Sequence, residues 1–202
     1  MFLLLIIKPQ ITLTETQLVV ELKNGSEQAF SVLVQTYQNM VFNAVLGIVQ
    51  QLEEAEDVAQ EVFIQVYQSI KGFRGDAKLS TWVYRISITK ALDFERGKKA
   101  KKRINALKNI IGIGEKDESS IPDFHHPGIA LDIKEEANIL FKAIKKLPEN
   151  QRVAFVLIKV EGLNYANTAQ ILNTTEKGIE GLMHRAKENL RKILADYYST
   201  KN

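Results

Sequence analysis

Residues 164–190, NYANTAQILNTTEKGIEGLMHRAKENL, are the most informative stretch for the structure of the C-terminal part of the chain. They predict two short helices joined by a tight turn. Asn164 and Thr175 can each accept a free backbone N–H at a helix start, and Asn173 tolerates the left-handed conformation that often ends a helix. Ala169 is small enough to let the helices cross closely. This is the pattern of a helix-turn-helix, whose second helix enters the DNA major groove, although an ordinary helical hairpin fits the same residues equally well.

The composition limits the classes of function that the chain can have. Its 202 residues are enough for two small domains or one medium one, and 45% apolar residues are typical of a globular protein. The net charge of 27 − 24 = +3 is mild, so any nucleic-acid surface has to come from local clustering of cations. The chain has no cysteine, which excludes disulfides and thiolate metal sites and favours a cytoplasmic location.

The apolar start, Met1–Ile7, is too short to span a bilayer and lacks the features of a signal peptide. We therefore expect residues 1–13 to be an N-terminal extension with no membrane role. Beyond it the apolar residues recur at helical spacing, and we expect an all-α protein of two small helical domains joined by a flexible linker. Residues 104–133, with glycines, serines and prolines, form the expected linker between domains at 14–103 and 134–202.

Three helices are expected in the first domain. Ser26 can cap the first, and Ser80 can cap the third, which fades into the basic run 98–103. The second begins near Glu53 and carries a predicted core stripe, made of Ala55, Val58, Ala59, Val62, Phe63, Val66, Tyr67 and Ile70.

Three blocks of sequence resemble a known family when they are taken together. They are EAEDVAQEVF at 54–63, LSTWVYRI at 79–86 and LPENQR at 147–152, and EGL at 161–163 then leads into the helix-turn-helix. In order and spacing they are similar to the bacterial RNA polymerase sigma factors of the extracytoplasmic-function group. The resemblance implies a promoter-specificity subunit whose first domain opens the −10 element and whose second, helix-turn-helix domain reads the −35 element. Core RNA polymerase and promoter DNA are the implied partners, and an anti-sigma factor is common for this family.

The second predicted helix carries an acidic face. Its apolar stripe leaves Asp57, Gln60, Glu61 and Gln65 near one another on the exposed side, because residues three and four apart are neighbours on a helix. Alone, such a face is ordinary solvated surface. In the resembled family it docks on a coiled coil of the polymerase clamp, so the resemblance implies that Asp57, Gln60 and Glu61 bind polymerase.

The third predicted helix combines aromatic residues at its start with cations further along. Residues 90–103 hold seven cations against two acids, 7 − 2 = +5. This mixture suits a melted strand, because phosphates need charge and unpaired bases need stacking surfaces. Trp82 fits a core position as well, whereas Tyr84 and Arg85 are expected on the surface. The preceding loop, 71–79, matches the family loop that captures a flipped base. The candidate −10 residues are Lys71, Arg74, Lys78, Tyr84, Arg85, Thr89, Asp93, Arg96, Lys98 and Lys99.

The second helix of the helix-turn-helix has a predicted buried face at Ile179, Met183, Ala186, Leu190 and Ile193. The residues left to face DNA are Thr175, Lys177, Gly178, Glu180, Gly181, His184, Arg185 and Lys187. Glu180 and Leu182 stand where the resembled family commonly carries Lys and Arg. A glutamate can accept from a cytosine amino group and an apolar side chain can meet a thymine methyl, so these departures bear on the promoter sequence.

Two other functions fit parts of the pattern. A stand-alone helix-turn-helix regulator would have a similar second domain but no reason to carry the acidic face. A helical adaptor without DNA binding would lack salt-dependent binding to nucleic acid. His125-His126, with neither a thiolate nor a helical i, i+4 partner, makes a poor metal site. The chain also has no catalytic Ser/His/Asp constellation and no phosphate-binding glycine loop, so we expect neither a cofactor nor catalysis.

Overall fold

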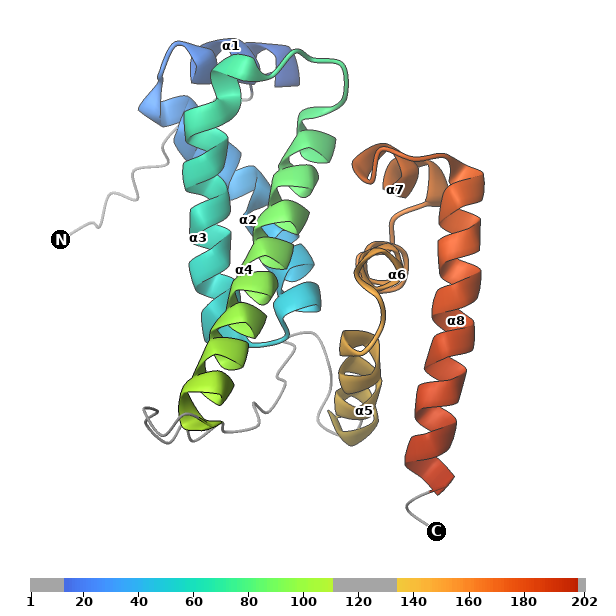
Figure 1. Cartoon of the computed structure of the whole chain (residues 1–202). Helices are drawn as coiled ribbons and strands as arrows, with labels where there is room; N and C mark the ends of the chain where they lie inside the picture. Colours follow the sequence, from blue (N-terminus) through green and yellow to red (C-terminus); the bar gives the residue numbers. More distant parts are fainter. Residues whose placement is uncertain (1–12, 111–133, 200–202) are drawn as a thin grey trace, which may run out of the picture.

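The computed structural model describes residues 13–110 and 134–199, and all regular structure in them is helical (Figure 1). The elements form two groups, as expected. The first group contains α1 (Glu15–Lys23), α2 (Glu27–Val49), α3 (Leu52–Ser69), the 3-10 turn η1 (Ile70–Gly72) and α4 (Leu79–Ile110). The second contains α5 (Lys134–Lys145), α6 (Glu149–Phe155), the π-helical turn η3 (Val156–Val160), α7 (Tyr165–Ile171) and α8 (Glu176–Ser199).

In the first group α2, α3 and α4 pack into a bundle, and α1 crosses its upper end (Figure 1). Ser26 caps α2 as predicted, because its hydroxyl accepts the Ala29 N–H at 3.2 Å. By length and composition α2 could cross a membrane, but its apolar residues supply the bundle core, with Leu33, Val41 and Val45 completely buried. The apolar character of α2 is thus explained by packing.

The core stripe of α3 is confirmed at most positions, with Ala55, Val58, Val62 and Val66 buried. Tyr67 is an exception, since 48% of it is exposed and the prediction of a core position was wrong. Its ring lies edge-on to Phe30 at a centroid distance of 5.2 Å, at the rim of the α2–α3 contact. A wide stripe places its outermost members at such a rim, where an aromatic ring is only partly covered.

The start of α4 also differs from the prediction. The helix begins at Leu79, and Ser80 is its second residue. The Leu79 N–H is bonded by a carboxylate oxygen of Glu15 at 3.0 Å, so α1 supplies the cap that Ser80 was expected to provide. At its other end α4 continues through the expected domain boundary at 103 as far as Ile110, while residues 111–133 lie outside the described part.

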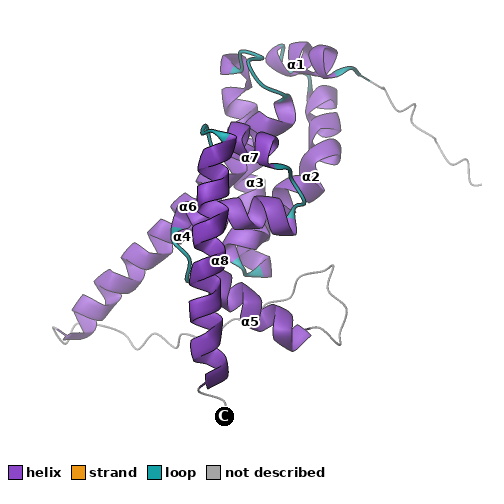
Figure 2. Cartoon of the chain, turned by 90° about the vertical axis from the view of Figure 1, so that its right-hand side faces the viewer, coloured by secondary structure: helices purple, strands orange, loops and turns teal. Residues whose placement is uncertain are grey.

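The second group confirms the helix-turn-helix in its local details (Figure 2). Asn164 accepts the Asn167 N–H at 2.8 Å, and Thr175 accepts the Gly178 N–H at 3.1 Å. Asn173 has φ +50°, the left-handed conformation expected of it. A small core of Ala154, Ala169, Ile179 and Met183 holds α6, α7 and α8 together.

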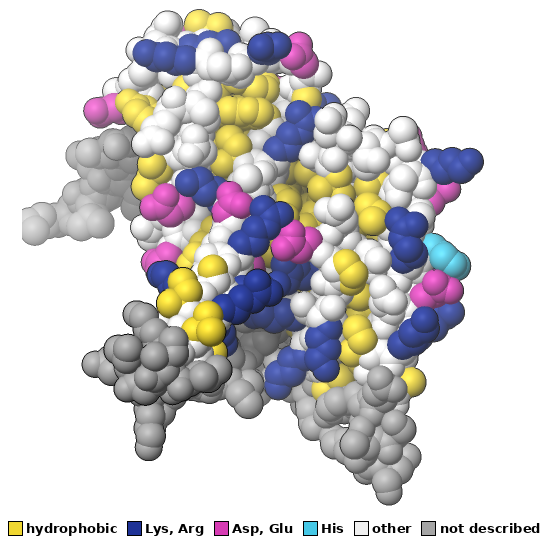
Figure 3. Space-filling model, viewed as in Figure 1, with side chains coloured by type: hydrophobic (Ala, Val, Ile, Leu, Met, Phe, Trp, Pro, Cys, Tyr) yellow, Lys and Arg dark blue, Asp and Glu magenta, His cyan; other side chains and the backbone are white. Residues whose placement is uncertain are grey.

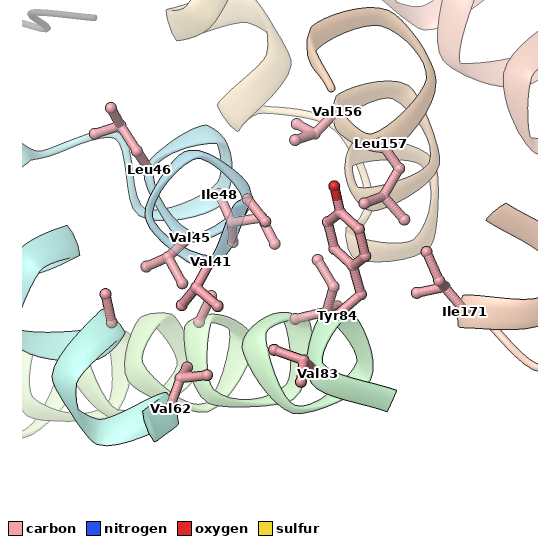
Figure 4. Packing of buried hydrophobic residues seen from close by; sticks show 14 of the residues in the cluster. Val41, Val45, Leu46, Ile48, Val62, Val83, Tyr84, Val156, Leu157 and Ile171 are labelled. Atoms are coloured by element: carbon pink, nitrogen blue, oxygen red, sulfur yellow. The ribbon is translucent and has the colours of Figure 1, made fainter. Parts of the chain in front are cut away.

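The two groups pack against each other. Contacts join α4 to α7 and α2 to η3, and Figure 4 shows Tyr84 of α4 pointing toward Val156 and Leu157 with Ile171 nearby. The approach is close at Gly47 of α2, where an added Cβ would lie 2.5 Å from Val156 Cγ1. The helical spacing of apolar residues in the sequence did not predict this interface.

Candidate nucleic-acid interface

The exposed face of α8 carries the residues predicted to meet the −35 element. Six of them are exposed and two glycines are half-buried, and the full set is Thr175, Lys177, Gly178, Glu180, Gly181, His184, Arg185 and Lys187. Figure 3 shows cations and a histidine along the edge of the molecule formed by α8. This face is therefore open for a ligand, and its opposite side holds the predicted buried residues, from Ile179 to Leu190.

Two glycines shape this face. A Cβ on Gly178 would lie 2.7 Å from Thr174 Oγ1, so the glycine lets the turn pack closely against the first turn of α8. A Cβ on Gly181 would lie 3.8 Å from both Nη atoms of Arg185. The Arg185 guanidinium therefore reaches back toward the N-terminus of α8, the direction in which helical side chains tilt. His184 lies 3.5 Å from Glu188 and points away from the core.

The candidate −10 residues lie in the loop before α4 and along α4. Lys71, Arg74, Lys78 and Lys99 are exposed. Lys98 forms an ion pair with Glu54, which offsets part of the expected positive charge. Arg96 bonds Asp93 at 3.2 Å and Glu149 of the second group at 2.7 Å, and the Thr89 hydroxyl donates to the Arg85 carbonyl at 2.8 Å. The cationic surface is consequently smaller than the count of cations in the sequence indicated.

Tyr84 is not on the surface, and that prediction was wrong. Only 8% of it is exposed, because η3 and α7 cover its ring. Its hydroxyl hydrogen-bonds to the Glu161 carboxyl, and burial together with Glu161 raises the pKa of Tyr84 to about 12. Burial likewise raises the pKa of Glu161 to about 7. Trp82 is half-buried and packs against Phe73 at a centroid distance of 5.2 Å, so it belongs to the base of the loop.

Arg85 is half-buried and is held by the helix-turn-helix. Its Nε donates to the Ile171 carbonyl at 3.3 Å and its Nη2 to the Gln170 carbonyl at 2.5 Å. These carbonyls end α7, where the helix dipole favours a cation. Tyr84 and Arg85 thus contact the second group in this arrangement.

A buried charge cluster between the two groups was missed by the sequence reasoning. Glu95 is 3% exposed and Arg152 is 1% exposed, with 3.7 Å between carboxylate and guanidinium, and Lys145 lies 3.8 Å from Glu95. Burial lowers the pKa of Arg152 and of Lys145. Within the described residues Arg152 Nε and Nη2 have no hydrogen-bond partner. No local signal marked Glu95, because an acid within a basic run ordinarily faces solvent.

The acidic face of α3 is exposed on the outside of the bundle. Asp57, Gln60 and Glu61 all lie on it, and Glu61 is 3.7 Å from Lys90. The face continues along α3 into two apolar side chains that the sequence reasoning did not assign to it. They are Ile64, 49% exposed, and Tyr67. Ile64 is three residues after Glu61 and four after Gln60, and Tyr67 is three residues after Ile64, so helical spacing is the signal that would have placed them there.

No group of residues suited to a metal ion occurs in residues 13–110 and 134–199. His125 and His126, the pair considered as metal ligands, lie outside the described residues.

Comparison with known proteins identifies the family of this chain. Residues 33–101 match Sigma-70 region 2 and residues 137–190 match Sigma-70 region 4. The RNA polymerase sigma-H factor of Pseudomonas aeruginosa is 30% identical over 89% of this chain and 93% of its own length. The ECF RNA polymerase sigma factor SigW of Bacillus subtilis is 31% identical over 87% of this chain and 94% of its own length.

The fold is also that of a solved sigma factor. The structure of RpoE in complex with the anti-sigma factor NepR from Bartonella quintana superposes with a TM-score of 0.55 at 20% identity, covering 82% of this chain and 96% of RpoE. The chain thus belongs to the extracytoplasmic-function sigma factors of the sigma-70 family, which bind core RNA polymerase and direct promoter-specific initiation of transcription.

Proposed function

We propose that this sigma factor divides promoter recognition between its two groups of helices. Residues 14–103 bind core polymerase and open the −10 element, and residues 134–202 read the −35 element. The observation that carries the proposal is the acidic and apolar face of α3, where Asp57, Gln60, Glu61 and Ile64 stay exposed while the two groups of helices are packed together. A regulator that binds DNA by itself has no need of such a face.

The polymerase-binding surface in this proposal is Asp57, Gln60 and Glu61, extended by Ile64 and Tyr67. Exposed apolar side chains beside charged ones are typical of an interface, where the apolar part supplies buried area and the charges orient the partner. The charges on this face are predominantly negative, so its partner surface on polymerase is positively charged.

The −10 surface in this proposal is the loop before α4 together with the cations of α4, and the −35 surface is the exposed face of α8. Tyr84 and Arg85 belong to the −10 set, yet both contact the second group. Melted DNA therefore reaches them only when α7 and η3 move away from α4. Binding of polymerase or promoter would stabilise the separated arrangement.

We also propose that the chain has no catalytic activity of its own and that it is located in the cytoplasm. It also includes regulation by an anti-sigma factor, by analogy with Bartonella quintana RpoE, which was solved with the anti-sigma factor NepR.

Run-off transcription with purified core polymerase tests the proposal directly. The chain should support transcription from promoters that carry matched −35 and −10 elements, and core polymerase alone should not. Tight sequence-specific binding of duplex DNA by the isolated chain, with no stimulation of core polymerase, would favour the stand-alone regulator.

A further inference from the structure

The loop between η1 and α4 is exposed in its middle and anchored at both ends. Phe73 is 7% exposed and Leu79 is completely buried. Between them Arg74, Gly75, Asp76 and Lys78 are exposed, and Gly75 has φ +80°. A loop with fixed ends and a free crest presents its side chains in a defined place.

Each end of the loop is bonded by a side chain of α1. Lys23 Nζ donates to the Phe73 carbonyl oxygen at 2.7 Å, and a Glu15 carboxylate oxygen accepts the Leu79 N–H at 3.0 Å. The two side chains lie at opposite ends of α1, about 12 Å apart along its axis at 1.5 Å per residue. In Figure 1, α1 lies across the same end of the bundle as this loop.

α1 is itself firmly placed, so it can serve as a support. Thr14 and Gln17 form a reciprocal capping box at its start. Leu18 and Leu22 are 6% and 3% exposed, because they pack into the bundle core. A short helix with both its start and its buried face fixed has little freedom to shift the two side chains that hold the loop.

The two bonds are placed where they matter for the shape of the loop. The Leu79 N–H is one of the N–H groups that a helix start leaves without an internal partner, and a carboxylate there also complements the helix dipole. Phe73, whose carbonyl Lys23 holds, packs against Trp82 in the first turn of α4. The loop base, Trp82 and the start of α4 are therefore packed together.

We propose that α1 is a positioning element for −10 recognition, in which Glu15 and Lys23 hold residues 73–79 in the shape that captures an unpaired base. This inference rests on the proposed role of the loop in opening the −10 element. Neither side chain need touch DNA, since each acts through the loop backbone that it bonds.

The test compares E15A and K23M with the unaltered protein in complete complexes with core polymerase. Opening is followed by permanganate reactivity of unpaired thymines on a set of promoters that differ at single −10 bases. Each variant should open the preferred promoter at least tenfold more slowly and should discriminate at least fivefold less between −10 bases. Binding to polymerase and to the −35 element should stay within twofold of the unaltered protein. E21A changes an exposed acid of α1 for which no bond to the loop is seen, and it should behave as the unaltered protein.

Conservative variants separate positioning from simple loss of structure. E15Q keeps an oxygen for the Leu79 N–H and K23R keeps a donor for the Phe73 carbonyl, so both should retain base discrimination within twofold. The inference would be overturned if E15A and K23M slowed opening by the same factor on every −10 sequence. It would also be overturned if both variants discriminated between −10 bases as well as the unaltered protein does. If the unaltered protein itself showed no discrimination among −10 bases, the proposed function of the loop would fail instead.

Discussion

Adding one methyl group at Gly47 should separate the two groups of helices without weakening either. Gly47 is a buried residue of α2, and a Cβ there would lie 2.5 Å from Val156 Cγ1 of η3. Val156 is completely buried and β-branched, so its methyl groups cannot swing aside easily. The Gly47→Ala change therefore forces the two groups apart.

The magnitude follows from the geometry. Carbon atoms pack best at about 3.5–4.0 Å, so the new contact is about 1 Å or more too short. Overpacking of this kind costs about 1–3 kcal/mol. The cost falls on the closed arrangement, in which the two groups of helices touch, and not on the open arrangement, in which they are separated. Alanine also stabilises a helix interior by about 1 kcal/mol relative to glycine, and that gain stays within α2 whether or not the groups touch. The closed-to-open ratio should fall by about 5- to 150-fold while the first group melts at the same or a higher temperature.

A pair of dyes measures this ratio. The chain has no cysteine, so Gln68→Cys on α3 and Lys192→Cys on α8 give two unique exposed attachment points. Energy transfer between the dyes should fall in G47A. Gly97→Ala adds the same methyl to an exposed position of α4 with no atom within 4 Å, and it should leave the transfer unchanged.

Val156→Ala removes the clashing methyl groups and supplies the decisive comparison. The double variant G47A/V156A should regain much of the energy transfer that G47A loses. If energy transfer in G47A equals that in G47A/V156A, or equals that in G97A, the clash with Val156 does not separate the two groups of helices.

Three further outcomes are expected. Burial raises the pKa of Glu161 from 4.5 to about 7, so the neutral carboxyl favours the closed arrangement. The closed arrangement should be fully stable at low pH and weaken as the pH rises through about 7, and energy transfer should fall accordingly. The E161Q variant should not show this pH dependence. Reversing Asp57 and Glu61 to Lys should lower affinity for core polymerase by like-charge repulsion, with circular dichroism unchanged; unaltered affinity would remove α3 from the interface. Arg185→Ala should weaken −35 binding uniformly across sequences and lower the salt slope by about one, whereas a loss confined to particular base pairs would mean that Arg185 reads a base.

Much of the fold was predictable because its determinants are local. Asn164 and Thr175 each bond an N–H three residues away, so the cap is written within one turn of sequence. The buried faces of α3 and α8 follow from helical spacing, which a sequence displays directly. The exposed acidic face of α3 is the complement of that spacing, and it was predictable for the same reason.

The parts that were not predictable depend on partners far along the chain. Glu15 bonds Leu79 across 64 positions, so nothing near Ser80 revealed that the cap of α4 was already supplied. Arg85 bonds Ile171 across 86 positions, and Tyr84 is covered by η3 and α7. Arginine and tyrosine are both residue types that are ordinarily found at the surface. Burial of a polar side chain is decided by whatever packs over it. Helical spacing predicts which side of a helix packs into its own bundle. Whether a second group of helices covers the remaining side depends on the packing of the whole chain, which the spacing does not contain.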